Sequence, residues 1–355
     1  MPVVWFLDAE GLSYNTRDTV NGRHALHILI TGAAGMIGRK LVRRLVADGA
    51  LHGRAVDKLT LQDVVRYSDE VAGPAVDIVA SDLTAPGEAA KLIVARPDAI
   101  FHLAGVVSGE AELDFDKGYR VNLDGMQALL AAIRQSVLET GKDYHPKLVF
   151  SSSIAVYGAP FPPAIPDDVQ LTPLTSYGTQ KAICELLLAD HHRRGFLDGI
   201  GIRLPTICVR PGKPNKAASG FFSGIIREPL AGHEVVLPVA DTVRHTHASP
   251  RAAVGFLIHA AGLTREQLGP RINLAMPGVC CTVAEQIEAL ARVAGPKVAA
   301  RIRREPDDLI MRIVGGWAER VEARRATALG FKAEASFDEI VRNHIDDELA
   351  GRIAA

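Results

Sequence analysis

Cysteine is scarce in this chain of 355 residues. The four cysteines, Cys184, Cys208, Cys280 and Cys281, form no C-x-x-C pair, and no second cluster of metal ligands accompanies them. This spacing argues against a zinc site, so no bound metal is expected. Unpaired thiols are typical of a reducing compartment, which predicts a cytoplasmic protein.

Long apolar runs and an excess of charge of one sign are also missing. No run of about 18 apolar residues occurs, so no segment is expected to span a membrane. A formal net charge of −1 gives no basis for binding nucleic acid or an anionic membrane surface. The length suits one large α/β domain, or a nucleotide-binding domain with a smaller companion.

The first 24 residues carry no motif that suggests chemistry. Residues 1–7 are apolar, but Asp8 and Glu10 follow and no basic segment precedes them, which is unlike a signal peptide. We interpret residues 1–24 as an N-terminal extension and expect the folded part to begin at residue 25.

An apolar segment at residues 27–30 leads into a glycine-rich turn and then into a segment of helical periodicity. Strand, glycine turn and helix in this order are the context of a dinucleotide-binding fingerprint. The first glycine permits a tight turn, the second lets a pyrophosphate approach the backbone, and the third lets the helix pack closely on the strand. The free N–H groups of the helix start would face the phosphates. The residues expected to hold them are Gly32, Gly35, Met36, Ile37 and Gly38.

Further apolar segments predict strands at residues 58–64, 76–79, 99–105 and 147–150. Because they alternate with helical segments, they predict a doubly wound parallel sheet of the Rossmann type, which binds ligands at the carboxyl ends of its strands. Asp63 lies at such an end, where an acid accepts hydrogen bonds from the adenosine ribose. Since this acid would repel the 2′-phosphate of NADP, NAD is the expected cofactor.

Small and polar residues also occur at the ends of the strands predicted at residues 99–105 and 147–150. Ala104 and Gly105 allow a ligand close to the backbone, whereas His102 before them is expected to pack in the core. Tyr177 and Lys181 lie four residues apart on a predicted helix and project from one face. Alone, such a pair is typical of a surface. Together with the glycine turn and the serine-rich end of the fifth strand, it indicates a catalytic pair.

The motifs together resemble those of the extended short-chain dehydrogenase/reductase family, which includes NAD-dependent epimerases and dehydratases. They are T-G-A-A-G-M-I-G at residues 31–38, H-L-A-G at 102–105, F-S-S-S-I-A-V-Y-G at 150–158 and Y-G-T-Q-K at 177–181. The resemblance covers roughly residues 25–275. It implies three catalytic residues, Ser153, Tyr177 and Lys181.

Each of the three has a definite expected role. Tyr177 takes a proton from a substrate hydroxyl while hydride leaves the same carbon for the nicotinamide. A phenol is a weak base at neutral pH, and the positive charge of Lys181 favours the phenolate. Lys181 also suits the ribose hydroxyls of the cofactor, and Ser153 would orient the substrate oxygen.

The resemblance assigns further residues to the cofactor. Asp82 and Leu83 would lie beside the adenine, and Pro205 and Thr206, on a sixth strand predicted at residues 203–209, beside the nicotinamide. The remaining members of this set are Leu103, Ala104, Gly105 and the structural Asn122.

The composition changes after Gly212, which predicts two lobes. We assign residues 25–212 and about 244–276 to an NAD-binding Rossmann domain. Residues of about 213–243 and 277–355 are assigned to a smaller, mostly helical substrate-binding lobe. Within it, Thr282-x-x-Glu285 is a capping box that predicts a helix to about Ala294. The charged run at residues 319–325 predicts a solvated helix face.

Two departures from nucleotide-sugar epimerases bear on the substrate. Those enzymes carry an Asn-Leu pair where this chain has residues 219–221, and a carboxylate where it has Arg251. Both changes suit a small carboxylate better than a nucleoside diphosphate. Arg244 is the expected partner of that carboxylate, with Arg210 and Arg251 as lesser candidates. The side chains expected to read the substrate hydroxyls are Ser108, Ser153 and Asn215.

The favoured function is therefore an NAD-dependent dehydrogenase that oxidises the 2-hydroxyl of a small sugar acid of the D-erythronate type. Similarity to dehydrogenases of such acids rests on the fingerprint, on L-T-L-Q-D-V at residues 59–64 and on R-L-P-T-I-C-V-R-P-G at 203–212. Dehydration is not expected, because Ile154 and Ala155 replace the Asp-Glu pair that dehydratases need. A nucleotide-sugar 4-epimerase that retains its NAD is the alternative. A third candidate function is that of a non-catalytic NAD sensor. The three catalytic residues argue against it, because a sensor has no need of them. The expected partners are a small-molecule substrate and a second copy in a homodimer.

Overall fold

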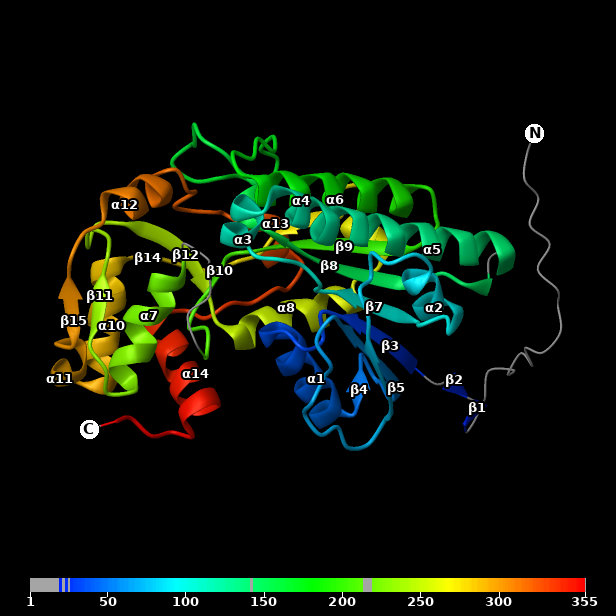
Figure 1. The fold of residues 1–355 in the computed structure, drawn as a ribbon, viewed down its shortest axis with the longest axis horizontal. Helices are drawn as coiled ribbons and strands as arrows, with labels where there is room; N and C mark the ends of the chain where they lie inside the picture. Colours follow the sequence, from blue (N-terminus) through cyan, green and yellow to red (C-terminus); the bar gives the residue numbers. More distant parts are fainter. Residues whose placement is uncertain (1–18, 21–22, 25, 141–142, 213–218, 355) are drawn as a thin grey trace.

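A mainly parallel β-sheet forms the centre of the molecule (Figure 1). The computed structural model describes residues 19–20, 23–24, 26–140, 143–212 and 219–354. Within these ranges the main sheet has eight strands. In spatial order, six of them are β13 (Asn273–Ala275), β9 (Asp198–Leu204), β8 (Lys147–Ser153), β7 (Ala99–His102), β3 (Leu26–Thr31) and β5 (Arg54–Asp63). The other two both pair with β5: β6 (Ala75–Ala80) runs parallel to it and β4 (Ala50–Leu51) antiparallel.

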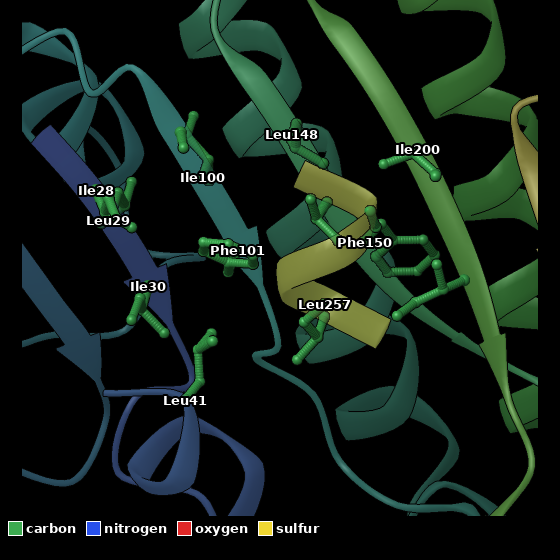
Figure 2. Close-up of a cluster of buried hydrophobic side chains, with 14 of the residues drawn as sticks. Ile28, Leu29, Ile30, Leu41, Ile100, Phe101, Leu148, Phe150, Ile200 and Leu257 are labelled. Carbon is green, nitrogen blue, oxygen red and sulfur yellow. The ribbon is translucent and has the colours of Figure 1, made fainter. Parts of the chain in front are cut away.

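The doubly wound topology predicted from the sequence is confirmed. The chain starts the sheet at β3 in its middle, moves outward through β5 and β6, and returns to build the other half from β7 to β13. Strands covered on both faces need apolar residues at every position. Ile28, Leu29 and Ile30 of β3 accordingly have no exposed surface. Figure 2 shows them in one hydrophobic cluster with Phe101 of β7 and Phe150 of β8.

Helices cover both faces of this sheet (Figure 1). On one face lie α2 (Glu88–Val94), α5 (Gly125–Thr140) and α6 (Ser176–Arg193), and on the other α1 (Met36–Asp48) and α8 (Pro250–Gly262). Shorter elements are α3 (Ser108–Leu113), α4 (Phe115–Gly118), the π-helix η1 (Tyr119–Asp124), the 3₁₀-turn η3 (Ile154–Val156), α9 (Arg265–Leu268) and α13 (Arg324–Ala328). None of the helices in the described residues is long and apolar enough to cross a membrane.

A second hydrophobic cluster lies beyond the carboxyl ends of the strands, at the left of Figure 1. It is built by α7 (Gly220–Leu230), α10 (Val283–Ala294), α11 (Pro296–Ala299), α12 (Asp308–Gly315) and α14 (Phe337–Leu349), with β14 (Val279–Thr282) and the pair of β11 (Val235–Leu237) and β15 (Ile302–Arg304). β14 belongs to a three-stranded sheet with β10 (Thr206–Ile207) and β12 (Arg244–Ala248), whose Ile207 and Ala248 are part of the first cluster. The capping box of Thr282 and Glu285 begins α10 as predicted. The first cluster also includes Ala326 and Phe331. Part of the range 277–355 therefore packs against the main sheet, and the division into a cofactor-binding and a substrate-binding lobe stays a prediction.

Three local predictions need correction or fall outside the described residues. The sixth strand is in fact two strands, because Pro205 has no N–H to continue the ladder after Leu204. Residues 319–323 are not helical; Val321 instead pairs with Ile165, and a helix begins only at Arg324. Of the N-terminal extension, only the pair β1 (Thr19–Val20) and β2 (Arg23–His24) is described.

A buried ion pair ties α6 to the middle of the sheet. The guanidinium of Arg203 on β9 donates to both carboxylate oxygens of Glu185 on α6, at 2.7 to 3.1 Å. Ser152 on β8 donates to the same carboxylate at 2.6 Å, and Arg203 also donates to the hydroxyl of Tyr157 at 3.1 Å. Only 1% of the Glu185 side chain and 9% of the Arg203 side chain are exposed. A charge left here without its partner would be costly.

We expect the Arg203→Met substitution to lower the free energy of unfolding by about 3–5 kcal/mol, because it leaves the Glu185 carboxylate buried without a cation. Chemical denaturation at neutral pH measures this. Arg244→Met is the matched control: it breaks the exposed Arg244–Glu285 pair and should cost less than about 1 kcal/mol. Pairing Arg203→Met with Glu185→Leu should restore part of the loss. Equal costs for the two single variants would contradict the prediction.

Candidate active site

A cleft of about 450 Å³ opens where the carboxyl ends of the central strands meet the second lobe. Its wall is formed by the turn after β3, the loop after β7, the end of β8, the start of α6 and the residues that follow β9. Most of the sequence-predicted site residues lie in it. They are Gly32, Gly35, Met36, Ile37, Gly38, Leu103, Gly105, Ser108, Ser153, Tyr177, Lys181, Pro205 and Thr206.

The glycine turn has the geometry that a pyrophosphate needs. Gly32 has a φ of +74°, and a Cβ on it would lie 2.6 Å from the backbone nitrogen of Ala104. A Cβ on Gly38 would lie 2.4 Å from the Gly32 carbonyl oxygen, so any larger residue would push α1 off the strand. Gly35 caps α1 without a side-chain hydrogen bond, and no acid lies in the first turn. The N–H groups of that turn are thus available to an anion.

Tyr177 and Ser153 are brought together by a close contact between two backbones. Tyr177 lies in the first turn of α6, which Thr175 caps by accepting a hydrogen bond from the Gly178 N–H at 3.0 Å. A Cβ on Gly178 would lie 2.1 Å from the Ala155 carbonyl oxygen. Only glycine therefore lets α6 abut the turn η3 that follows Ser153. The Ser153 Oγ accepts the Ala155 N–H at 3.1 Å, which leaves its own proton free to donate into the cleft.

Lys181 is held one turn below Tyr177. It is 4% exposed, and its ammonium donates to the Ser151 carbonyl oxygen at 2.9 Å. The ammonium nitrogen lies 5.6 Å from the centre of the Tyr177 ring and 4.7 Å from that of Phe150. A fixed positive charge at this place would stabilise any negative charge on the tyrosine oxygen.

Segments outside the main sheet add residues to the wall that the sequence analysis ranked low or missed. Arg210 lies in the cleft with Ser219, His245 and Trp317. Its Nε donates to the Ile207 carbonyl oxygen at 2.9 Å and its Nη2 to the Ser219 Oγ at 2.7 Å. Among the described residues it has no carboxylate partner. Burial lowers the pKa of Arg210, while the nearby Cys208 and Tyr177 act in the opposite direction.

A family model described as the NAD dependent epimerase/dehydratase family matches residues 28–247. The chain belongs to this family. Over 326 residues it is 48% identical to the D-erythronate dehydrogenase of Cupriavidus necator, a match that covers 91% of this chain and 98% of that protein. The D-erythronate dehydrogenase of Haemophilus influenzae is 40% identical, with 91% and 100% covered.

A solved structure with high similarity is described as the nucleoside-diphosphate-sugar epimerase from Agrobacterium tumefaciens. It is 61% identical, has a TM-score of 0.91, and the match covers 96% of this chain and 100% of that one. Family membership and the dehydrogenase relatives make this protein an NAD-dependent oxidoreductase that acts on a CH–OH group. The uncapped start of α1 and its close-packed glycines fit the pyrophosphate of NAD.

Two of the remaining predicted cofactor residues are acids, Asp63 at the end of β5 and Asp82 shortly after β6. The carboxylate of Asp63 accepts hydrogen bonds from the N–H groups of Ala34 and Val65, at 3.0 and 3.1 Å, and so lies at the glycine turn. Asp82 accepts both the hydroxyl and the N–H of Thr84, and these bonds hold its pKa below the ordinary value. Neither acid lines the cleft itself, and both remain proposals for the adenosine end.

Other predicted residues serve the architecture. The side chain of Leu83 is buried in the main core. Asn122 bonds the backbone of Val106 and the side chain of Gln180, and thereby ties the loop after β7 to α6. His102 packs in the core as expected, stacked on Phe150. Asn215 lies outside the described residues, as part of 213–218.

The structure does not bring Arg244 into the cleft. Its guanidinium lies 3.6 Å from the Glu285 carboxylate, and its side chain is 39% exposed. Side chains alternate along β12, so His245 faces the cleft and Arg244 faces away. Arg251 pairs with Asp347 on α14 and also lies outside the cleft. Neither Arg244, the expected partner of the carboxylate, nor Arg251, a lesser candidate, lines the cleft, and Arg244 is displaced from it by one residue along β12.

Asp63 generates a prediction about the choice of cofactor. NAD should be strongly preferred over NADP, and Asp63→Ala should narrow the preference mainly through the KM of the cofactor. Asp63→Asn keeps a hydrogen-bond acceptor for the glycine turn but removes the charge, so it should narrow the preference as well. Initial rates with both cofactors measure this. Equal use of NAD and NADP by the parent enzyme would refute it.

Proposed function

We propose that this protein is an NAD-dependent dehydrogenase that oxidises the 2-hydroxyl of a small sugar acid, D-erythronate or a close relative, to the 2-oxo acid. Relatives named D-erythronate dehydrogenase that match over nearly their full length support this substrate class. The observation that carries the proposal is Arg210, a guanidinium without an acidic partner among the described residues, in the same cleft as Tyr177.

An acid substrate would complete the bonding of this guanidinium. Of the five N–H donors of Arg210, the Nε–H and one on Nη2 are used by Ile207 and Ser219. Three donors, two of them on Nη1, remain for the two oxygens of a carboxylate, the geometry in which arginine binds acids most strongly. The described wall of the cleft contains no Asp or Glu that would compete. A carboxylate there would also sit near the tyrosine that handles the proton.

The catalytic residues divide the reaction between proton and charge. Tyr177 accepts the proton of the 2-hydroxyl, and Ser153 donates its free hydrogen to the same substrate oxygen and orients it. Lys181 stabilises the developing phenolate and suits the ribose hydroxyls of the cofactor. NAD, when bound, supplies the acceptor for the hydride from C2. The carboxylate on Arg210 fixes C1, so that C2 is held beside Tyr177.

A nucleotide-sugar 4-epimerase is the second candidate, favoured by the description of the Agrobacterium structure. It would use the same three catalytic residues and regenerate its NAD. A nucleoside diphosphate brings two phosphates, and in the described wall the cations are Lys181 and Arg210. Mixing the protein with free NAD and D-erythronate separates the two functions. Net formation of reduced nicotinamide supports the dehydrogenase, whereas NAD that stays bound while UDP-sugars are interconverted supports the epimerase.

Removal of the Tyr177 hydroxyl should lower turnover strongly and leave NAD binding unchanged. Tyr177→Phe keeps the ring but loses the oxygen, so kcat should fall by at least about 10²-fold, the usual scale of general-base catalysis. NAD affinity, measured by calorimetry, should change little. Lys181→Met should reduce both kcat and NAD affinity, because Lys181 serves both. Near-normal turnover by Tyr177→Phe would refute the assignment.

Replacement of the arginine should weaken acid binding selectively. Arg210→Lys keeps the charge but loses the fork, so the KM for the sugar acid should rise at least about tenfold while NAD affinity stays unchanged. Arg244→Lys is the matched comparison outside the cleft and should leave the KM near that of the parent. If Arg244→Lys raises the KM and Arg210→Lys does not, the carboxylate binds where the sequence first suggested.

A further inference from the structure

Thr206 and His245 form a hydrogen-bonded pair in the wall of the cleft. The Oγ1 of Thr206 on β10 lies 2.7 Å from the Nε2 of His245 on the neighbouring strand β12. Both residues line the cleft, and His245 is 3% exposed. Its ring is stacked on Phe222, with centres 5.4 Å apart, and contacts Trp317. The imidazole is therefore fixed in place, and the reaction mechanism gives it no task.

The direction of this hydrogen bond follows from the surroundings of the imidazole. Burial lowers the pKa of His245 to about 4, so the ring is neutral at physiological pH. The backbone of Ala318 acts on the pKa in the opposite direction, as a carbonyl does when it accepts an imidazole N–H. Nε2 faces the Thr206 Oγ1 at 2.7 Å, so we assign the proton of the neutral ring to Nδ1, which leaves Nε2 as an acceptor. With this tautomer the Thr206 hydroxyl donates to His245.

A hydroxyl that has committed its proton offers only its lone pairs to other groups. Thr206 thus presents an acceptor to the cleft. It adjoins Ile207, whose carbonyl oxygen accepts from Arg210. The acceptor and the guanidinium consequently belong to the same short segment of the wall. An acid held by Arg210, with its 2-hydroxyl at Tyr177, would extend its next carbon along this segment.

We propose that His245 is a positioning residue that keeps Thr206 as a hydrogen-bond acceptor, and that Thr206 selects sugar acids carrying a hydroxyl on C3. This inference rests on the proposed function and deepens it from 2-hydroxy acids to 2,3-dihydroxy acids. A site built to receive a substrate hydroxyl discriminates against the analogue that lacks it, because its polar group is then buried without a partner.

The test compares two substrates in four proteins. The substrates are D-erythronate and the 3-deoxy analogue, 2,4-dihydroxybutanoate of the same configuration at C2. The proteins are the parent, Thr206→Ser, Thr206→Val and His245→Phe. In the parent, kcat/KM for D-erythronate should exceed that for the analogue by at least about tenfold. Thr206→Ser, which keeps the hydroxyl, should retain this ratio.

The two other variants should lose the discrimination. Thr206→Val should bring the ratio close to one by slowing D-erythronate oxidation while leaving the analogue nearly unaffected. His245→Phe keeps a ring against Phe222 but removes the acceptor of the Thr206 proton, so the ratio should fall at least about threefold. If either residue had a purely structural role, its substitution would lower kcat/KM for both substrates by the same factor. The KM for NAD, measured in all four proteins, tests the alternative role that the sequence suggested for Thr206, a contact with the nicotinamide.

Each other outcome overturns a definite statement. If the parent oxidises no sugar acid, the proposed function itself fails. If it oxidises both acids equally well, the proposed function stands and the role of Thr206 is wrong. If Thr206→Val raises the KM for NAD with an unchanged substrate ratio, the acceptor serves the nicotinamide amide and not the substrate. If His245→Phe leaves the ratio intact, the hydroxyl is oriented without the histidine.

Discussion

The active site depends on one buried ion pair. Tyr177, Lys181 and Glu185 follow one another at intervals of four residues on α6 and share a face of that helix. Glu185 is fixed by Arg203 on β9 and by Ser152, the neighbour of Ser153 on β8. A single carboxylate therefore sets the position of the helix that carries Tyr177 relative to the strand that carries Ser153. Moving either element would separate charges that have little access to water.

Backbone contacts complete this arrangement where side chains would be too large. Gly178 against Ala155, Gly38 against Gly32 and Gly32 against Ala104 each bring two main chains closer than any Cβ allows. The first contact places the start of α6, with Tyr177, beside the turn that follows Ser153. The other two place a helix start beside the strand ends, where its unpaired N–H groups face the cleft. Catalytic geometry here is thus a matter of main-chain packing as much as of the reactive side chains.

The parts of this molecule that could be predicted from sequence are those whose causes are local. The glycine turn, the strands at its sides and the capping box of α10 are each encoded within a few residues. The predicted catalytic residues line one cleft because parallel strands end at one edge of the sheet. The break in the sixth strand at Pro205 could have been predicted in the same way, because proline has no N–H to continue the hydrogen bonds between strands.

What escaped prediction depends on contacts between distant segments. Arg244 and His245 are equally plausible from the sequence, and only the packing of β12 against Phe222 decides which one faces inward. Arg210 differs from many other arginines of the chain in having no carboxylate partner among the described residues. The cleft around it is formed by distant parts of the sequence, so the sequence alone does not reveal this difference. The segment at Trp317 reaches the cleft through the pairing of Val321 with Ile165, residues more than a hundred positions apart in the chain.

The wall of the cleft is built partly by the main sheet and partly by segments outside it, and this division has a consequence for how the site can change. The segments that carry Arg210, His245 and Trp317 take no part in the main sheet or in the glycine turn. A substitution on these segments would reshape the wall of the cleft without touching the main sheet or the glycine turn. The part of the cleft beside Tyr177 could thus change while the strands and the turn that frame it stay the same.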